Sequence, residues 1–394
     1  MKHFLSLLIP ILIFANRPDL KLLEYQQRYS LCHGKTNYQI AQCLLNGNLN
    51  FYALRGDGLQ PFKINLQQFK LAEEKGDVYD YVLSLLPHTR RYIGLLAYID
   101  YLYRIKDDYM TPRFKGDFME DIVFTKHIFN LLQDAKLEEN SLYTPAFETE
   151  IREFQRRHGL TIDGKIGRAT KRALTLPIEN IINKVKKNII LERLSPPKEN
   201  NYIYVNIPEF KMYYYYDNEP LISMKVVVGR PKMRTPIFHR NIRYIVLNPR
   251  WNVPPSIYQK EYANKSYEEL QTKGFAFNKE GKLYQKSGRR NALGVVKFLF
   301  PNKFNVYMHD TPAKSLFKKN KRAYSHGCIR LEKPLALLNA LGYQRDTHKN
   351  KWITLEHQIP VYIEYHTVWI DNQGIVQFRN DIYGYEKKLF HTSK

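Results

Sequence analysis

The sequence predicts a multidomain α+β protein, with helical segments first and a mostly β domain after them. At 394 residues the chain is longer than a single hydrophobic core usually requires. Apolar residues recur at helical spacing before residue 177, most clearly over 90–105 and 122–132. After residue 200, short β-rich runs alternate with Gly, Pro and Asn and show no βαβ rhythm, which predicts a sandwich or open barrel.

The N-terminal residues 1–15, MKHFLSLLIPILIFA, have the pattern of a secretory signal peptide: a Lys, then an apolar run too short to span a bilayer comfortably. The alternative is an uncleaved anchor. No later segment is apolar enough to cross a membrane, so we expect an exported mature protein with no stable membrane span. Residues 16–135 follow as a helical scaffold without a catalytic cluster.

Residues 141–177 form a compact helical unit. Thr144 followed by Pro145 is typical of a helix start, and Phe147, Ile151 and Phe154 would share one helix face. Turns at Asp163-Gly164 and Gly167 precede a helix over 168–174. Residues 180–200, rich in Lys, Glu and Asn, are interpreted as a connector.

The mostly β domain is predicted over 200–366, and residues 367–394 form a C-terminal tail. Six strands are expected, at 202–207, 211–216, 222–228, 243–247, 305–308 and 361–365, with one helix at 334–341 that Gly342 ends. An insertion over 258–286 has little strand pattern and a helical stretch at 266–273, and we expect it to cap the domain as a mobile lid.

The formal net charge is +23. Such an excess would suit nucleic acid, an anionic membrane or wall polymer, or acidic small substrates, and it is equally consistent with solvated surface lysines. No RNP, zinc-finger or helix-turn-helix pattern supports nucleic acid, so no nucleic-acid partner is expected.

Three cysteines are present, Cys32, Cys43 and Cys328. In an exported protein the first two could pair as a disulfide, or they could be two buried free thiols. Either way Cys328 is the odd thiol, which is a liability outside the cytoplasm unless it carries chemistry.

The residues around Cys328 are those that thiol chemistry requires. A thiol becomes a strong nucleophile as the thiolate and needs a base or a positive field nearby. His326 stands two residues before it, and His309 falls at the end of the strand expected over 305–308. Gly327 lets backbone N–H groups converge as an oxyanion hole. A metal site is not expected, because no second Cys or acidic ligand stands at metal spacing.

Ser325-His326-Gly327-Cys328-Ile329-Arg330, together with His309, resembles the L,D-transpeptidase (YkuD-type) catalytic domain. The runs 228–231, 235–238, 247–257 and 291–294, with parts of 367–384, are similar to the large multidomain Gram-negative subgroup. The "FQ…GL…DG…G" pattern of 141–177 resembles a peptidoglycan-binding domain. The alternative for that unit is a helical spacer that binds nothing.

The resemblance implies a cofactor-free cysteine acyltransferase of the periplasmic cell wall, acting on peptidoglycan stem peptides and glycan. Cys328 would attack a tetrapeptide stem, His309 would move the proton, D-Ala would leave, and an amine would resolve the thioester into a 3–3 cross-link. His326, Gly327, Ser325 and Arg330 are expected to support the loop or the oxyanion. The substrate-binding candidates are Tyr307, Trp251 and Asn252.

Two positions depart from the commonest family motif. Arg330 replaces an Asn, as in the large subgroup, and Asp310 follows the base where Ser or Gly often stands. The group that orients His309 is therefore open, a backbone carbonyl being one option. Two alternatives remain for the function: an L,D-carboxypeptidase that trims tetrapeptides to tripeptides, and a non-catalytic wall-binding protein.

Overall fold

The computed structural model describes residues 18–111, 114, 118–133 and 135–390. The signal-peptide prediction for residues 1–15 lies outside them. The chain divides into two compact units. The first unit contains residues 1–53, 59–196 and 366–394, and the second contains 54–58 and 197–365. Over the described residues, no helix combines the length and apolar character needed to cross a membrane.

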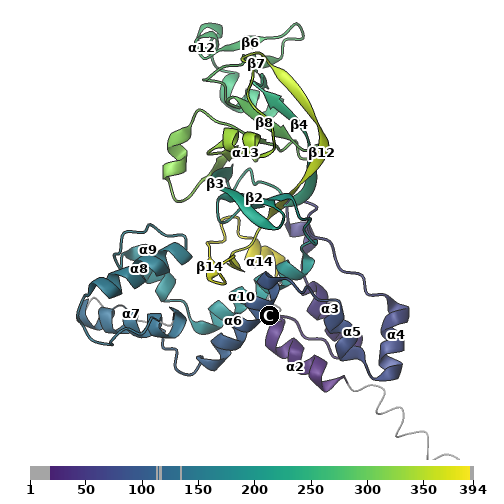
Figure 1. Ribbon diagram of the computed structural model, residues 1–394, viewed down its shortest axis with the longest axis vertical. Coiled ribbons are helices and arrows are strands. Elements are labelled where there is room, and N and C mark those ends of the chain that lie inside the picture. The colour runs from purple at the N-terminus through teal and green to yellow at the C-terminus, as the bar shows by residue number, and fades with distance from the viewer. Residues whose placement is uncertain (1–17, 112–113, 115–117, 134, 391–394) are drawn as a thin grey trace, which may run out of the picture. The chain divides into compact units, whose positions relative to one another are not determined.

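The first unit is mainly helical (Figure 1). Its elements are α2 (Leu20–Tyr29), α3 (Asn37–Asn46), η1 (Phe51–Ala53), α4 (Leu66–Lys75), α5 (Val78–Ser84), α6 (Arg90–Arg104), α7 (Phe118–Gln133), α8 (Pro145–Arg157), α9 (Arg168–Leu174), α10 (Ile178–Leu194), the two-stranded sheet of β13 (Val368–Ile370) and β14 (Val376–Phe378), and α14 (Tyr385–Leu389). One apolar cluster joins these helices to β13 and β14.

The compact unit after residue 140 folds around one buried amide. Thr144 caps α8 by accepting a hydrogen bond from the Phe147 N–H, as its sequence predicts. The Gln155 side chain accepts from the backbone N–H groups of Asp163 and Gly164, each at 3.0 Å, and donates to the Lys165 carbonyl at 2.9 Å. The buried Gln155 side chain therefore supplies hydrogen-bond partners for the backbone of this tight turn.

The connector prediction for 180–200 was wrong. Residues Ile178–Leu194 form α10, and most of this helix is buried in the first unit. The apolar positions Ile178, Ile181, Ile182, Val185 and Ile189 have helical spacing, but Lys and Asn between them hid it.

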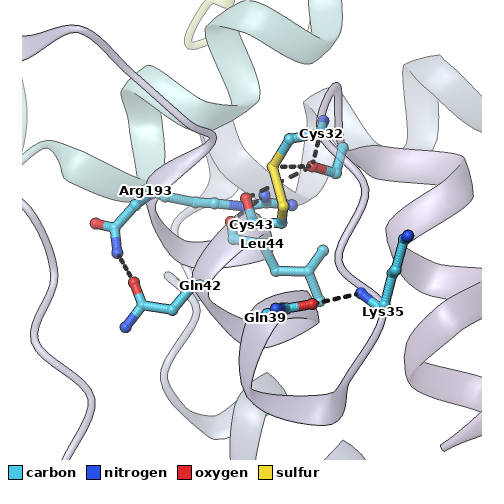
Figure 2. The surroundings of a disulfide bond; sticks show 9 residues. Cys32, Lys35, Gln39, Gln42, Cys43, Leu44 and Arg193 are labelled. Carbon is cyan, nitrogen blue, oxygen red and sulfur yellow. Dashed lines mark hydrogen bonds between the residues drawn. A yellow bond between two sulfur atoms is a disulfide. The ribbon is translucent and has the colours of Figure 1, made fainter. Parts of the chain in front are cut away.

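Cys32 and Cys43 form a disulfide in the first unit (Figure 2). The bond links the loop before α3 to the last turn of that helix. Beside it the Arg193 guanidinium of α10 donates to the Leu44 carbonyl. Cys328 is the free cysteine.

The second unit is built on a sheet that closes on itself. Its strands are β1 (Tyr202–Asn206), β2 (Lys211–Tyr216), β3 (Glu219–Gly229), β4 (Phe238–Leu247), β8 (Val296–Leu299), β9 (Met308–His309), β10 (Ala323–Ser325), β11 (Ile329–Leu331) and β12 (Lys351–Glu364). The order is β10-β3-β11-β9-β8-β4-β12-β1-β2, and β2 also pairs with β3. The fold-class prediction is confirmed, and the pairing of β2 with β3 closes the ring.

Most of the expected strands are present, but the strand predicted at 305–308 begins later, at Met308. Asn305 has a φ of 55°, which interrupts an extended backbone. Helix α13 (Pro334–Ala340) ends before Gly342, whose φ of 84° suits the predicted stop. The second unit also contains η3 (Lys314–Lys318).

The insertion is more ordered than its sequence pattern indicated. It contains η2 (Tyr258–Tyr262), α12 (Tyr267–Thr272), β6 (Phe275–Phe277) and β7 (Leu283–Gln285). Two elements precede it, β5 (Trp251–Asn252), which pairs with β7, and α11 (Pro255–Ile257). In Figure 1, β6, β7 and α12 lie together beyond β4 and β8. We call residues 251–286 the cap. A small apolar cluster holds it together, with Val253, Ile257, Leu270, Phe275 and Leu283 at its centre. The strands were missed because each has only two or three residues.

Candidate active site

Two parallel strands bring the predicted nucleophile and base together. β11 pairs with β9 so that Ile329 lies beside Met308 and Arg330 beside His309. Met308 and Ile329 are fully buried in the barrel. Because side chains alternate along a strand, His309 and Arg330 face the other side, together with Cys328, which lies two residues before Arg330.

The Cys328 side chain is half-buried. Its Sγ lies 3.9 Å from the Asn305 carbonyl oxygen. Burial raises the pKa of Cys328 above its ordinary value, while hydrogen bonds from Tyr307 and the charges of Lys297 and Arg330 act in the opposite direction. The raised pKa favours the protonated thiol, so a base would have to remove its proton before the sulfur could act as a nucleophile.

His309 has the tautomer that a general base needs. Its Nδ1 lies 2.5 Å from the Asp310 carbonyl oxygen, and since a carbonyl only accepts, Nδ1 carries the hydrogen. Nε2 then keeps the lone pair that can take a proton. Burial, followed by the charge of Arg330, lowers the pKa of His309 to about 3, so the ring is neutral near pH 7.

The carboxylate of Asp310 points away from this pair. It accepts from the Val295 N–H at 2.9 Å and lies 2.7 Å from the Lys314 ammonium. Gly294 is required opposite it, because a Cβ there would stand 2.2 Å from the Asp310 Oδ2 atom. Asp310 thus contacts His309 through its backbone carbonyl, the option that the sequence left open.

The hydroxyl groups of Ser325 and Thr235 hold the loop before the thiol in place through hydrogen bonds. Ser325 Oγ donates to the Cys328 carbonyl at 2.5 Å and accepts from the Gly327 N–H at 3.1 Å. Thr235 Oγ1 donates to the Gly327 carbonyl at 2.8 Å and accepts from the Gly229 N–H at 2.8 Å. Gly327 has a φ of 122°, which side chains rarely adopt. Its N–H is already engaged by Ser325.

His326 turns toward the cap. Its Nε2 lies 2.6 Å from Glu261 Oε1, in η2. The same carboxylate lies 4.0 Å from Arg230. His326 therefore links the thiol loop to the cap.

The cap contains a pocket of about 460 Å³. Trp251 lines it together with Tyr262 and Phe275, whose ring centroids lie 6.2 and 6.1 Å from that of Trp251. Burial raises the pKa of Tyr307 well above its ordinary value and Trp251 acts in the opposite direction, so Trp251 lies near the thiol's neighbour. Asn252 is exposed and is not among the residues that line this pocket.

The sequence did not predict three contributions to this region: the contact of Glu261 with His326, the hydrogen bond of Thr235 to the thiol loop, and the position of Lys297 opposite His309. Lys297 stands between Val296 and Phe298, a pattern typical of a strand with one polar face. This strand, β8, was not among the predicted ones, and the register that sets Lys297 opposite His309 comes from its pairing with β9. Among the described residues, no group of three His, Cys, Asp or Glu side chains could hold a metal ion.

Two family models match parts of this chain. The L,D-transpeptidase catalytic domain model, YkuD, matches residues 200–363. This part of the chain is similar to the YkuD family. A second model, "Putative peptidoglycan binding domain", matches residues 129–174. The predicted resemblances to both families are confirmed.

A curated relative from Haemophilus influenzae, named "Putative L,D-transpeptidase", is 32% identical over 244 residues. The match covers 53% of this chain, and the chain spans about half, 49%, of that relative's length.

Solved L,D-transpeptidases are more distant. The enzyme from Mycobacterium smegmatis is 17% identical, with a TM-score of 0.26 over 42% of this chain and 58% of that one. The enzyme from Stackebrandtia nassauensis is 13% identical, with a TM-score of 0.28 over 63% of this chain and 91% of that one.

Proposed function

We propose that the protein is an L,D-transpeptidase that forms 3–3 peptidoglycan cross-links through a thioester on Cys328. The observation that supports this most is the pairing of β9 with β11, which sets His309 and the Cys328 loop on one face of neighbouring strands. The YkuD match over 200–363 supports the same reaction class, acyl transfer.

The first half-reaction follows from the protonation states. His309 Nε2 takes the Cys328 proton, and the sulfur attacks the carbonyl between the third stem residue and the terminal D-Ala. Backbone N–H groups of the thiol loop other than that of Gly327 would stabilise the oxyanion, with Ser325 and Thr235 holding that loop in place. The proton passes from His309 to the D-Ala amine, which leaves, and the thioester remains.

In the second half-reaction an amine of another stem peptide attacks the thioester. His309 accepts the proton of that amine, and the C–S bond breaks as the new amide forms. Water at the same step would give a tripeptide, which is the carboxypeptidase outcome. The cap pocket, with Trp251, Tyr262 and Phe275, offers a place for a second peptide beside the site, and this supports cross-linking over hydrolysis.

We further propose that the protein works in the cell wall outside the cytoplasm. The match of residues 129–174 to the binding-domain family supports peptidoglycan as its partner. Tyr307 and Trp251 would contact the donor peptide. The cap would act as a lid over the donor peptide, and the contact between His326 and Glu261 would connect it to the thiol loop.

Intact-mass spectrometry tests the acyl-enzyme. Protein incubated with a disaccharide-tetrapeptide, or with a carbapenem, should gain one adduct that maps to Cys328. Cys328→Ala should gain none. A folded wild-type protein that reacts with iodoacetamide yet takes neither acyl group would refute the proposal.

A further inference from the structure

Lys297 lies in one row with His309 and Arg330. β8 runs antiparallel to β9 with Lys297 opposite His309, and β11 places Arg330 on the other side of His309. The adjacent pair Phe298 and Met308 is fully buried in the barrel. Lys297 therefore projects on the opposite face, which is the face of Cys328.

The Lys297 ammonium is held directly over a neighbour of the thiol. Its Nζ stands 3.8 Å from the centroid of the Tyr307 ring, a close cation–π contact. Burial raises the pKa of Tyr307 well above its ordinary value, and the neighbouring Cys328 acts in the same direction. The contact with the ring holds the flexible lysine side chain on the face of Cys328.

Neither cation of this row has a carboxylate partner. Within the described part of the chain, no ion pair includes Lys297 or Arg330, and the buried Arg330 Nε has no hydrogen-bond partner there. The charged and titratable groups around them are Tyr307, His309 of β9, Cys328, and Glu261 of the cap, which acts on Arg330 from a distance. A partly desolvated cation without a counter-ion is costly. The group that can supply negative charge at Lys297 is Cys328.

We propose that Lys297 stabilises the Cys328 thiolate electrostatically during the acyl transfer, a role that rests on the proposed function for the reaction itself. The S–H bond breaks, its proton goes to His309 Nε2, and the electron pair stays on sulfur, facing Lys297. Lys297 remains protonated throughout. The same positive charge disfavours a protonated His309, so the proton moves on to the leaving amine.

The directions of the pKa shifts of Lys297 and Cys328 are consistent with this role. Burial lowers the pKa of Lys297, whereas a charge on Cys328 raises it. Reciprocally, Lys297 lowers the pKa of Cys328 against the effect of burial.

Alkylation of the single free thiol tests this without any wall substrate. The rate of Cys328 modification by iodoacetamide is measured by intact mass from pH 6 to 10 for wild type, Lys297→Met, Lys297→Gln and Lys297→Arg. Losing the charge should move the profile up by about one pH unit and slow modification at pH 8 about tenfold. Lys297→Arg keeps the charge and should stay within about threefold of wild type.

Lys351→Met is the matched control, since Lys351 is exposed on β12 and pairs with Asp346 at 2.6 Å. Its profile should superimpose on that of wild type. The inference is overturned if Lys297→Met and Lys297→Gln, folded by circular dichroism, also superimpose on wild type. Because the probe is iodoacetamide, a protein that fails to cross-link peptides still reports on Lys297, and an active transpeptidase with unchanged profiles would refute Lys297 alone.

Discussion

Ser325→Ala removes one hydroxyl that makes two hydrogen bonds in the thiol loop. Ser325 is buried, so the Cys328 carbonyl and the Gly327 N–H lose a partner where water enters poorly. An unmade buried hydrogen bond costs roughly 1–3 kcal/mol, which gives about 3 kcal/mol of unfolding free energy for the pair. At the urea dependence of a domain of this size, the second unit should unfold at a urea concentration about 1 M lower.

Urea unfolding followed by tryptophan fluorescence measures this, since Trp251 and Trp352 both lie in the second unit. Ser325→Thr keeps the hydroxyl and should recover most of the loss. Ser315→Ala changes an exposed serine of the same domain and should stay within about 0.5 kcal/mol of wild type. If Ser325→Ala and Ser315→Ala unfold at the same urea concentration, the assigned role of the hydroxyl is incorrect.

Three further predictions concern the base, the pH dependence and the disulfide. His309→Gln should lower the rate of D-Ala release by about 10²–10⁴-fold, as expected for a lost general base, and an equal rate would exclude that role. Because the pKa of His309 is lowered to about 3 and that of Cys328 is raised, Cys328 alkylation should rise steadily from pH 5 to above 9; an inflection near 6.5 would contradict this. The Cys32–Cys43 bond closes a short loop, so Cys32→Ala with Cys43→Ala should destabilise the helical unit by about 3 kcal/mol, measured by thermal unfolding, and unchanged stability would show that the bond is dispensable.

The sequence predicted the helix ends that neighbouring residues determine. The start of α8 at Thr144 and Pro145 depends on capping, and the end of α13 before Gly342 depends on backbone conformation. Both helix ends lie where the sequence predicts them. Helix α10 was missed because its apolar stripe is interrupted by Lys and Asn, which remain compatible with burial once a partner is near, as for Asn188 and Thr367.

The site was predictable only where its residues are close in sequence or share a recognised motif. The motif around Cys328 and the base His309 belong to that class. Glu261, Thr235 and Lys297 reach the site through strand pairing and through the cap, and their roles depend on a register that no local pattern contains. The carbonyl of Asp310 could not be assigned either, because every residue carries one.

The most direct test of the proposed acyl transfer is product analysis of a disaccharide-tetrapeptide incubated with the purified protein. Mass spectrometry should find released D-Ala and a 3–3 cross-linked dimer, with Cys328 carrying the acyl group during turnover and Cys328→Ala giving neither. Tripeptide alone would assign the thioester's resolution to water. No acyl-Cys328, no dimer and no tripeptide from a folded protein would contradict the account.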